Sequence, residues 1–145
     1  MSITNLLKRV QLFTTLNATE LEQIAAICTE KQAVPEELVI QQNTTGTGIY
    51  IIADGSVEVF IEGTDVARSL VVLGKGQVIG EMALIDQGYR SASVRATSKG
   101  ATLYRIGNDD FNGLCQENNH IGFVVMRNLA VDLAFKLRHR NLTEL

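Results

Sequence analysis

The sequence has no tryptophan, one proline and two cysteines among its 145 residues. Cys28 and Cys115 are far apart and form no CxxC pair, which disfavours both a disulfide framework and a zinc site. Each lies among apolar residues, where a thiol behaves as a small hydrophobic side chain. His120 and His139 are isolated, so neither a metal pair nor a hydrolytic triad is supported.

Long apolar runs and dense basic runs are also missing. No stretch approaches the roughly 18 consecutive apolar residues of a membrane span, and residues 1–5 lack the pattern of a signal peptide. We therefore expect a cytoplasmic protein without membrane contacts. The net charge is −3 and the basic residues do not cluster, which disfavours direct nucleic-acid binding. Because HExxH and GxSxG motifs are absent too, we expect no enzymatic activity, no cofactor and no metal.

Both ends of the chain predict helices. Residues 3–12 and 19–30 have helical periodicity, with Thr19 as the N-cap of the second helix. Helical patterns return over residues 108–118 and from about 121 to 140. No proline-rich or low-complexity linker divides the chain, so residues 1–145 are interpreted as a single domain.

The middle of the chain predicts antiparallel strands. Between about residues 37 and 107, short β-branched runs alternate with turn signals, which is typical of an antiparallel sandwich or barrel. The runs are residues 38–40, 49–52, 57–61, 70–73 and 102–106. Asp54-Gly55 between two of them predicts a hairpin.

One segment of this β-rich region carries the residue types of an anion site. Gly80 to Ala83 predict a short helical turn, whose N-terminal N–H groups could hold an anion. Arg90 offers a planar donor fork for two phosphate oxygens, and Ser91 adds a hydroxyl. Glu81 is a poor neighbour for phosphate but a good acceptor for a sugar hydroxyl. A phosphate binder beside a ribose acceptor indicates a nucleotide.

The same residues resemble a known motif. Gly80-Glu81-x-Ala83-Leu84, six further positions and then Arg90-Ser91-Ala92-x-Val94 are similar to the phosphate-binding cassette of cyclic-nucleotide-binding domains. The chain resembles the effector domains of catabolite-activator-like, or Crp-Fnr-like, regulators over nearly its whole length. Further matching segments are residues 12–24, 50–59 and 126–141.

The resemblance implies an α+β, mainly β, fold: an antiparallel β-roll or jelly-roll with N-terminal helices, a short phosphate-binding helix and a long C-terminal helix. It implies that Glu81 accepts from the ribose 2′-hydroxyl and that Arg90 pairs with the cyclic phosphate. The Ser91 hydroxyl and backbone N–H groups would help. These N–H groups belong to Met82, Ala83 and Ala92. The alternative interpretation needs no ligand: Arg90 is a surface ion-pair partner, and Glu81 is a carboxylate favoured by the helix dipole.

Four positions depart from the family pattern: Glu36, Asn43, Ile79 in place of the usual phenylalanine and Tyr89 in place of a common proline. Glu36 follows Pro35 where the family usually has glycine, and a type II turn needs a positive φ there, so Glu36 favours a type I turn. Asn43 replaces another common glycine, which is a mild change because asparagine tolerates the left-handed region.

We expect a cyclic-nucleotide-binding sensor module that transmits ligand occupancy through its C-terminal helix to an unknown protein partner. The resemblance favours cAMP over cGMP or a cyclic dinucleotide, and it places Arg140 and Asn141 as lid residues over the purine. No helix-turn-helix module follows before residue 145, so no DNA-binding domain is expected. The alternative is a pseudo-sensor of the same fold that acts as a docking or dimerisation domain without ligand.

The last helix carries a second apolar stripe of Val124, Val131, Phe135 and Leu142. Their seven- and four-residue steps match a coiled-coil seam, which favours a homodimer through this helix. Packing of the stripe against the chain's own N-terminal helices explains the same pattern, and the sequence leaves both explanations open.

Overall fold

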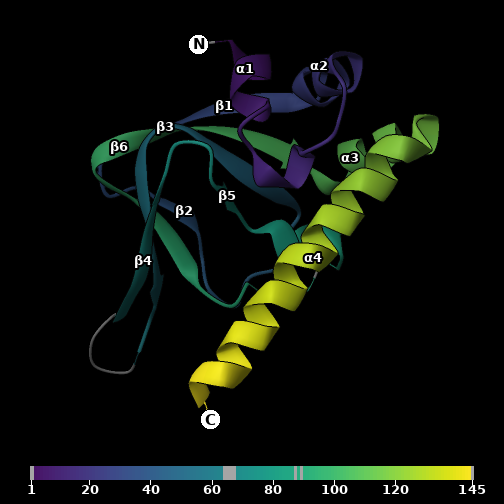
Figure 1. Cartoon of the computed structure of the whole chain (residues 1–145). Coiled ribbons are helices and arrows are strands. Elements are labelled where there is room, and N and C mark those ends of the chain that lie inside the picture. Colours follow the sequence, from purple (N-terminus) through teal and green to yellow (C-terminus); the bar gives the residue numbers. More distant parts are fainter. Residues whose placement is uncertain (1, 64–67, 87, 89, 145) are drawn as a thin grey trace. The chain divides into compact units, whose positions relative to one another are not determined.

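A computed structural model describes residues 2–63, 68–86, 88 and 90–144, without the side chains of Arg68 and of residues 140–144. The chain forms two compact units (Figure 1). One consists of residues 27–111, and the other combines residues 1–26 with residues 112–145.

The unit of residues 27–111 is an antiparallel sheet. Its strands are β1 (Cys28–Ala33), β2 (Leu38–Ile40), β3 (Gly48–Ile61), β4 (Arg68–Gly74), β5 (Val78–Ile79) and β6 (Ser93–Gly107). The order is β1-β6-β3-β4, with β2 paired to β6 and β5 paired to β3. A 3-10 turn, η2 (Glu81–Leu84), precedes β6, and helix α3 (Asn108–Glu117) follows it. The predicted fold class, an antiparallel sheet flanked by helices with a long C-terminal helix, is confirmed.

The predicted hairpin at Asp54-Gly55 is wrong, because both flanking runs belong to the single strand β3. Gly55 has φ +73° and lies between two register shifts in the pairing with β6. A Cβ at Gly55 would lie 2.1 Å from the Gly100 carbonyl oxygen. The glycine therefore permits a bulge and a close backbone approach in a continuing strand, which are also common uses of a strand glycine.

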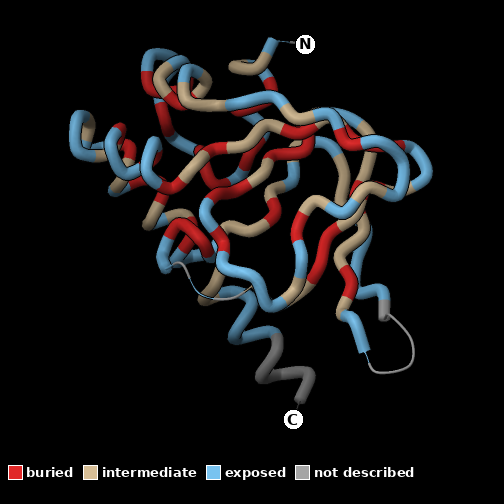
Figure 2. The backbone as a smooth tube through the Cα atoms, turned by 180° about the vertical axis from the view of Figure 1, so that it is seen from behind, coloured by how far each residue is buried: buried red, intermediate tan, exposed pale blue. Residues whose placement is uncertain are grey.

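Strands β3 and β6 carry the core of this unit. A buried cluster combines residues of five strands: Ala33, Ile40, Ile52, Val57, Ile79, Val94, Ala96, Ala101 and Leu103. Figure 2 shows such buried positions along the strands. By contrast, Leu70, Val71 and Val72 of β4 are between 46% and 57% exposed. The long central strands thus hold the apolar interior, and β4 contributes little to it.

The turn after Pro35 is not type I, so this prediction is wrong. Glu36 has φ +69°, and the Glu37 N–H donates to the Val34 carbonyl. The Glu37 carboxylate accepts from the Val34 N–H and from Lys31, which stabilises the turn despite the strained residue. Asn43 has φ +68°, as its tolerance for this region predicts.

The second unit consists of helices. They are α1 (Ile3–Leu7), the 3-10 turn η1 (Gln11–Phe13), α2 (Ala18–Ala26), the end of α3 and α4 (Asn119–Glu144). The predicted helix over residues 3–12 is interrupted, since Val10 has an extended backbone. The helix predicted over residues 19–30 ends at Ala26 because residues 28–33 pair with β6 instead.

The sequence predicted Thr19 as the N-cap of α2, but this prediction is wrong because α2 begins at Ala18. Asn17 Oδ1 accepts from the Glu20 N–H at 2.8 Å, and Glu20 Oε1 accepts from the Asn17 N–H at 3.1 Å. This reciprocal pair is a capping box that starts two residues before Thr19.

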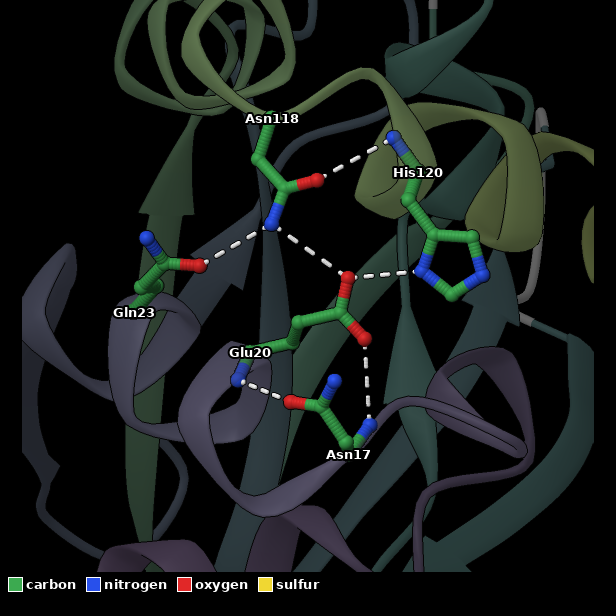
Figure 3. A network of polar contacts seen from close by, with 5 residues as sticks. All are labelled: Asn17, Glu20, Gln23, Asn118 and His120. Carbon is green, nitrogen blue, oxygen red and sulfur yellow. Dashed lines mark hydrogen bonds and ion pairs between the residues drawn. The ribbon is translucent and has the colours of Figure 1, made fainter.

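The Glu20 carboxylate is the centre of a polar network that joins α2 to the junction of α3 and α4 (Figure 3). Its Oε2 lies 2.7 Å from His120 Nδ1 and accepts from Asn118 Nδ2 at 3.3 Å. Asn118 Nδ2 also donates to Gln23 Oε1, and Asn118 Oδ1 accepts from the His120 N–H. Since a carboxylate only accepts, His120 must carry a proton on Nδ1.

Glu20 is only 4% exposed, yet its pKa lies below the ordinary value. Burial raises the pKa, but the hydrogen bonds from His120, from the Asn17 backbone and from Asn118, with the charge of His120, outweigh burial. The network therefore favours the ionised carboxylate.

The first half of α4 is packed, whereas the described side chains after Leu129 are half-buried or exposed. Asn128 Nδ2 donates to the Leu12 and Thr14 carbonyls at 3.0 and 2.9 Å, so this half contacts η1. Val124 of the predicted seam is buried, whereas Val131 and Phe135 are 55% and 59% exposed. Within the described residues, no helix is both long and apolar enough to cross a membrane.

Neither cysteine forms a disulfide in the described part of the chain, and burial raises the pKa of the Cys28 thiol to about 12 and also raises that of Cys115. Neither thiol is therefore ionised near neutral pH, in line with the predicted role of small apolar side chains.

Glu20→Gln should lower the free energy of unfolding at pH 7 by about 1–3 kcal/mol, because one carboxylate oxygen that accepts is replaced by a donor. A lowered folded pKa adds stability above the unfolded glutamate pKa of about 4.3, and this stability is lost as the pH falls through the folded value. The difference between the proteins should thus shrink below about pH 4. Urea unfolding between pH 3 and 8 measures it.

Glu22→Gln is the matched control, since Glu22 is exposed on the same helix. A Glu20→Gln protein as stable as the parent at pH 7 would contradict the role given to this network.

Candidate ligand-binding site

Gly80 and η2 form the first part of the site. Gly80 has φ +79°, and a Cβ there would lie 2.3 Å from Arg90 Nη1, so both backbone and space require glycine. The predicted short helix is a single 3-10 turn in which the Ala83 N–H donates to the Gly80 carbonyl at 3.0 Å. So short a turn has almost no macrodipole. The Ala83 N–H, expected to face the ligand, is engaged within the turn.

The Arg90 guanidinium lies over this turn. Its Nη1 donates to the Gly80 carbonyl at 3.2 Å and its Nη2 to the Gly48 carbonyl at 2.6 Å. A Cβ at Gly46 would lie 2.6 Å from Arg90 Cζ. The half-buried guanidinium therefore occupies a niche that exists because these positions lack side chains.

Backbone pairing between two loops holds Arg90 in this place. The Arg90 N–H donates to the Thr44 carbonyl at 2.7 Å, and the Asn43 N–H donates to the Arg90 carbonyl at 2.9 Å. Next to this pair, the buried Ser93 hydroxyl accepts from the Gln42 N–H at 2.8 Å. These hydrogen bonds join the loop before β3 to the start of the segment before β6 and form one wall.

An open pocket adjoins this wall. It is lined by Val39, Ile40, Gln41, Thr44, Thr45, Thr47, Gly48, Tyr50, Arg90 and Arg105. Only Arg90 among these was a predicted site residue. Arg105 and the threonines were missed, because they lie in segments without a motif. The one signal in the sequence was an arginine two residues after Leu103 in an apolar strand.

Burial lowers the pKa of Arg90, and the positive charge of Arg105 acts in the same direction. Tyr50 and Glu81 oppose this change. The guanidinium stays charged, because arginine is not deprotonated in proteins. A buried charge of this kind favours an anionic ligand.

The other predicted site residues are arranged around η2 and the start of β6. Glu81 and Ala92 are half-buried, Ser91 is exposed and Met82 is 50% exposed. Arg140 and Asn141 belong to α4 in the other unit, and their side chains lie outside the described residues. Among the described residues, no group of three or more His, Cys, Asp or Glu side chains could hold a metal ion.

Asn108, which the sequence analysis did not single out, anchors η2 by a hydrogen bond to its main chain. It is 5% exposed, its Nδ2 donates to the Ala83 carbonyl and its N–H donates to the Thr47 carbonyl at 2.9 Å. Its Oδ1 is buried without a hydrogen-bond partner in the described part of the chain. The Ala83 carbonyl determines this orientation, because the flipped amide would place two oxygens together.

Asn108→Asp should destabilise the protein at pH 7 by about 2 kcal/mol or more, because a buried carboxylate would then face the Ala83 carbonyl. Acidic pH should restore part of the loss, since a protonated carboxyl donates. Urea unfolding at pH 7 and pH 4 measures both effects. Asn112→Asp, exposed in the same helix, is the control and should be nearly neutral. Equal stability of Asn108→Asp and the parent would refute the anchoring role.

Comparison with known proteins identifies the family of the chain. A family profile described as "Cyclic nucleotide-binding domain" matches residues 30–118. The Cyclic AMP receptor protein of Thermus thermophilus is 34% identical over 107 residues, which are 72% of this chain and 46% of that protein. The chain thus spans less than half the length of this relative.

Two solved structures have the same fold. The N-terminal domain of a transcriptional regulator from Streptomyces coelicolor has a TM-score of 0.82 at 23% identity, with 97% of this chain and 95% of that chain covered. The Thermus thermophilus catabolite activator protein has a TM-score of 0.80 at 29% identity, with 92% and 61% covered.

Proposed function

The chain belongs to the cyclic nucleotide-binding domain family, and we propose that it is a cAMP-binding regulatory module whose ligand site is the pocket beside Arg90. Domains of this family are regulatory and bind ligands, and we propose no enzymatic activity here. The name of the Thermus relative supports cAMP as the first ligand to test. A cytoplasmic location stays a prediction.

The position of Arg90 carries the proposal. Its guanidinium is held at the pocket by two carbonyl oxygens, in a niche that substitution of Gly46 or Gly80 would fill. A phosphate that approaches the pocket exchanges these neutral acceptors for charged ones, and a charge-assisted hydrogen bond is about twice as strong as a neutral one. The exchange is therefore favourable for an anion.

The remaining roles follow the cassette. Glu81 accepts from the ribose 2′-hydroxyl, and its charge already acts on Arg90. Gly80, Met82, Ala83, Ser91 and Ala92 supply the backbone and hydroxyl donors. The Ala83 N–H becomes available to phosphate only when it leaves the Gly80 carbonyl. Binding of a cyclic phosphate thus includes a small rearrangement of η2.

We further propose that occupancy of the pocket is transmitted through α4, with Arg140 and Asn141 as lid residues, to an unidentified partner protein. The exposure of Val131 and Phe135 supports a homodimer through this helix, because two large apolar side chains four residues apart are left for a partner. The seam would then begin beyond Val124, which is buried within the protomer.

The second candidate function is a docking or dimerisation domain without ligand. One observation favours it: Arg90 already has two internal carbonyl partners, so its charge is stabilised without a phosphate. The test below separates the two functions.

Arg90→Leu should weaken cAMP binding at least about thirtyfold, because loss of one partner of a desolvated charge pair costs about 2–5 kcal/mol. Arg90→Lys keeps the charge but loses the planar fork, so its affinity for cAMP should lie between those of the parent and Arg90→Leu. Glu81→Ala should cost less, about 1.5–3 kcal/mol. Calorimetric titration with cAMP, cGMP and a cyclic dinucleotide measures the affinities. Unchanged affinity in Arg90→Leu would exclude this site, and no heat with any of the three ligands would favour the docking function.

cAMP should slow hydrogen exchange from Lys136 to the end of α4 as well as over residues 80–92. The described end of α4 has no buried side chain beyond Leu129, so it opens at low free-energy cost. A ligand that favours its closed form shifts this equilibrium by its differential affinity, typically 1–3 kcal/mol. Hydrogen exchange with mass-spectrometric detection measures it. Protection restricted to residues 80–92 would mean binding without transmission through α4.

A further inference from the structure

A second arginine lines the pocket beside Arg90. Arg105 Nη2 donates to Thr47 Oγ1 at 2.9 Å and to the Thr47 carbonyl at 3.3 Å. The same Nη2 lies 3.0 Å from the place where a Cβ of Gly48 would stand, and Arg90 Nη2 lies 2.6 Å from the Gly48 oxygen. The two guanidinium groups therefore flank one glycine, and both border the pocket.

The strand register explains why Arg105 lies there. In the pairing of β3 with β6, Arg105 stands opposite Tyr50. Residues opposite each other in a sheet share a face, and Tyr50 packs against the buried cluster that contains Ile52 and Leu103. Arg105 is thus the next position after Leu103 on the inner face, where an apolar residue would otherwise continue the core.

The charges around the pocket explain why Arg105 would attract an anion. Glu81 offsets part of the charge of Arg90 but does not line the pocket, so Arg105 adds to a net positive charge at the lining. A further carboxylate, that of Asp110, lies near Arg105. Asp110 Oδ2 and Arg105 Nη1 lie 3.7 Å and 3.1 Å from the position that a Cβ would take at Gly107. Asp110 is exposed, so solvent screens its charge more than that of the half-buried arginines. Burial and the charge of Arg105 both lower the pKa of Arg90, which reports their mutual repulsion.

On the basis of the proposed function, we propose that Arg105 is a second anion-binding residue of the pocket, which attracts the ligand phosphate by its charge from a position anchored on Thr47. A phosphodiester monoanion neutralises the net charge of the site and relieves the repulsion between the two arginines. Part of the affinity therefore depends on long-range charge, and salt weakens that part selectively.

The test compares matched variants of the full chain by calorimetric titration with cAMP at low and high salt. Arg105→Gln should weaken binding about five- to tenfold at 20 mM NaCl and less than about twofold at 500 mM, because salt screens the lost attraction. Arg105→Lys retains the charge and should restore most of the low-salt affinity. Arg95→Gln removes an equal charge from the same strand, where Arg95 pairs with Glu58 away from the pocket lining, and should change little.

Thr47→Val distinguishes the effect of the Arg105 charge from the effect of the hydrogen bond that positions this side chain. It removes the hydroxyl bonded to Arg105 and retains the arginine, so it should stay within about twofold of the parent at both salt concentrations if charge dominates. The proposal is overturned if Arg105→Gln binds like the parent at 20 mM NaCl. It is also overturned if the loss is equal at both salt concentrations and Thr47→Val reproduces it.

Inorganic phosphate is the second probe and keeps the two proposals apart. If the parent binds no cyclic nucleotide, the proposed function fails, but phosphate should still shift the amide resonances of Thr47, Gly48 and Arg90. Arg105→Gln should then need several-fold more phosphate for the same shifts. Equal phosphate dependence in both proteins, or no shift in the parent, refutes the role of Arg105.

Discussion

The site depends on the placement of one guanidinium against main-chain carbonyls. Arg90 bonds to Gly48, the first residue of β3, and to Gly80, the N-cap of η2, which are far apart in sequence. A half-buried cation without acceptors would be costly, and the carbonyls lower this cost without cancelling the charge. The loop wall, the 3-10 turn and the absent side chains around it all serve this placement. The same arrangement leaves a positive group beside a pocket and ready to exchange partners.

The cassette could be predicted from the sequence because its residues are close together and chemically unusual. Arg90 and Gly80 follow from local spacing, and the structure places them in contact. The helical ends and the β-rich middle were predictable from periodicity. The family match over residues 30–118 agrees with the resemblance of the motif.

What the sequence could not predict arises from long-range pairing. Gly55 has the local signature of a hairpin, but β6 pairs along the whole length of β3 and keeps the strand continuous. Residues 28–30 continue a helical pattern, yet edge pairing with β6 makes them a strand. Arg105 and Asn108 acquire their roles only from the register with Tyr50 and from the proximity of Ala83. Local spacing gave at most one weak signal of these contacts, the arginine two residues after Leu103 in an apolar strand.

Strand β4 has a consequence for the handling of this protein. It ends the main strand order, and its exposed Leu70, Val71 and Val72 follow one another without a charge or a proline. An apolar end strand offers main-chain groups and side chains to a strand from another molecule, which is the geometry of edge-to-edge aggregation. Arg68 and Lys75 stand at its two ends, where gatekeeper charges are found in natural sheets. We therefore expect concentrated samples to be less stable against aggregation at high ionic strength, which screens such charges.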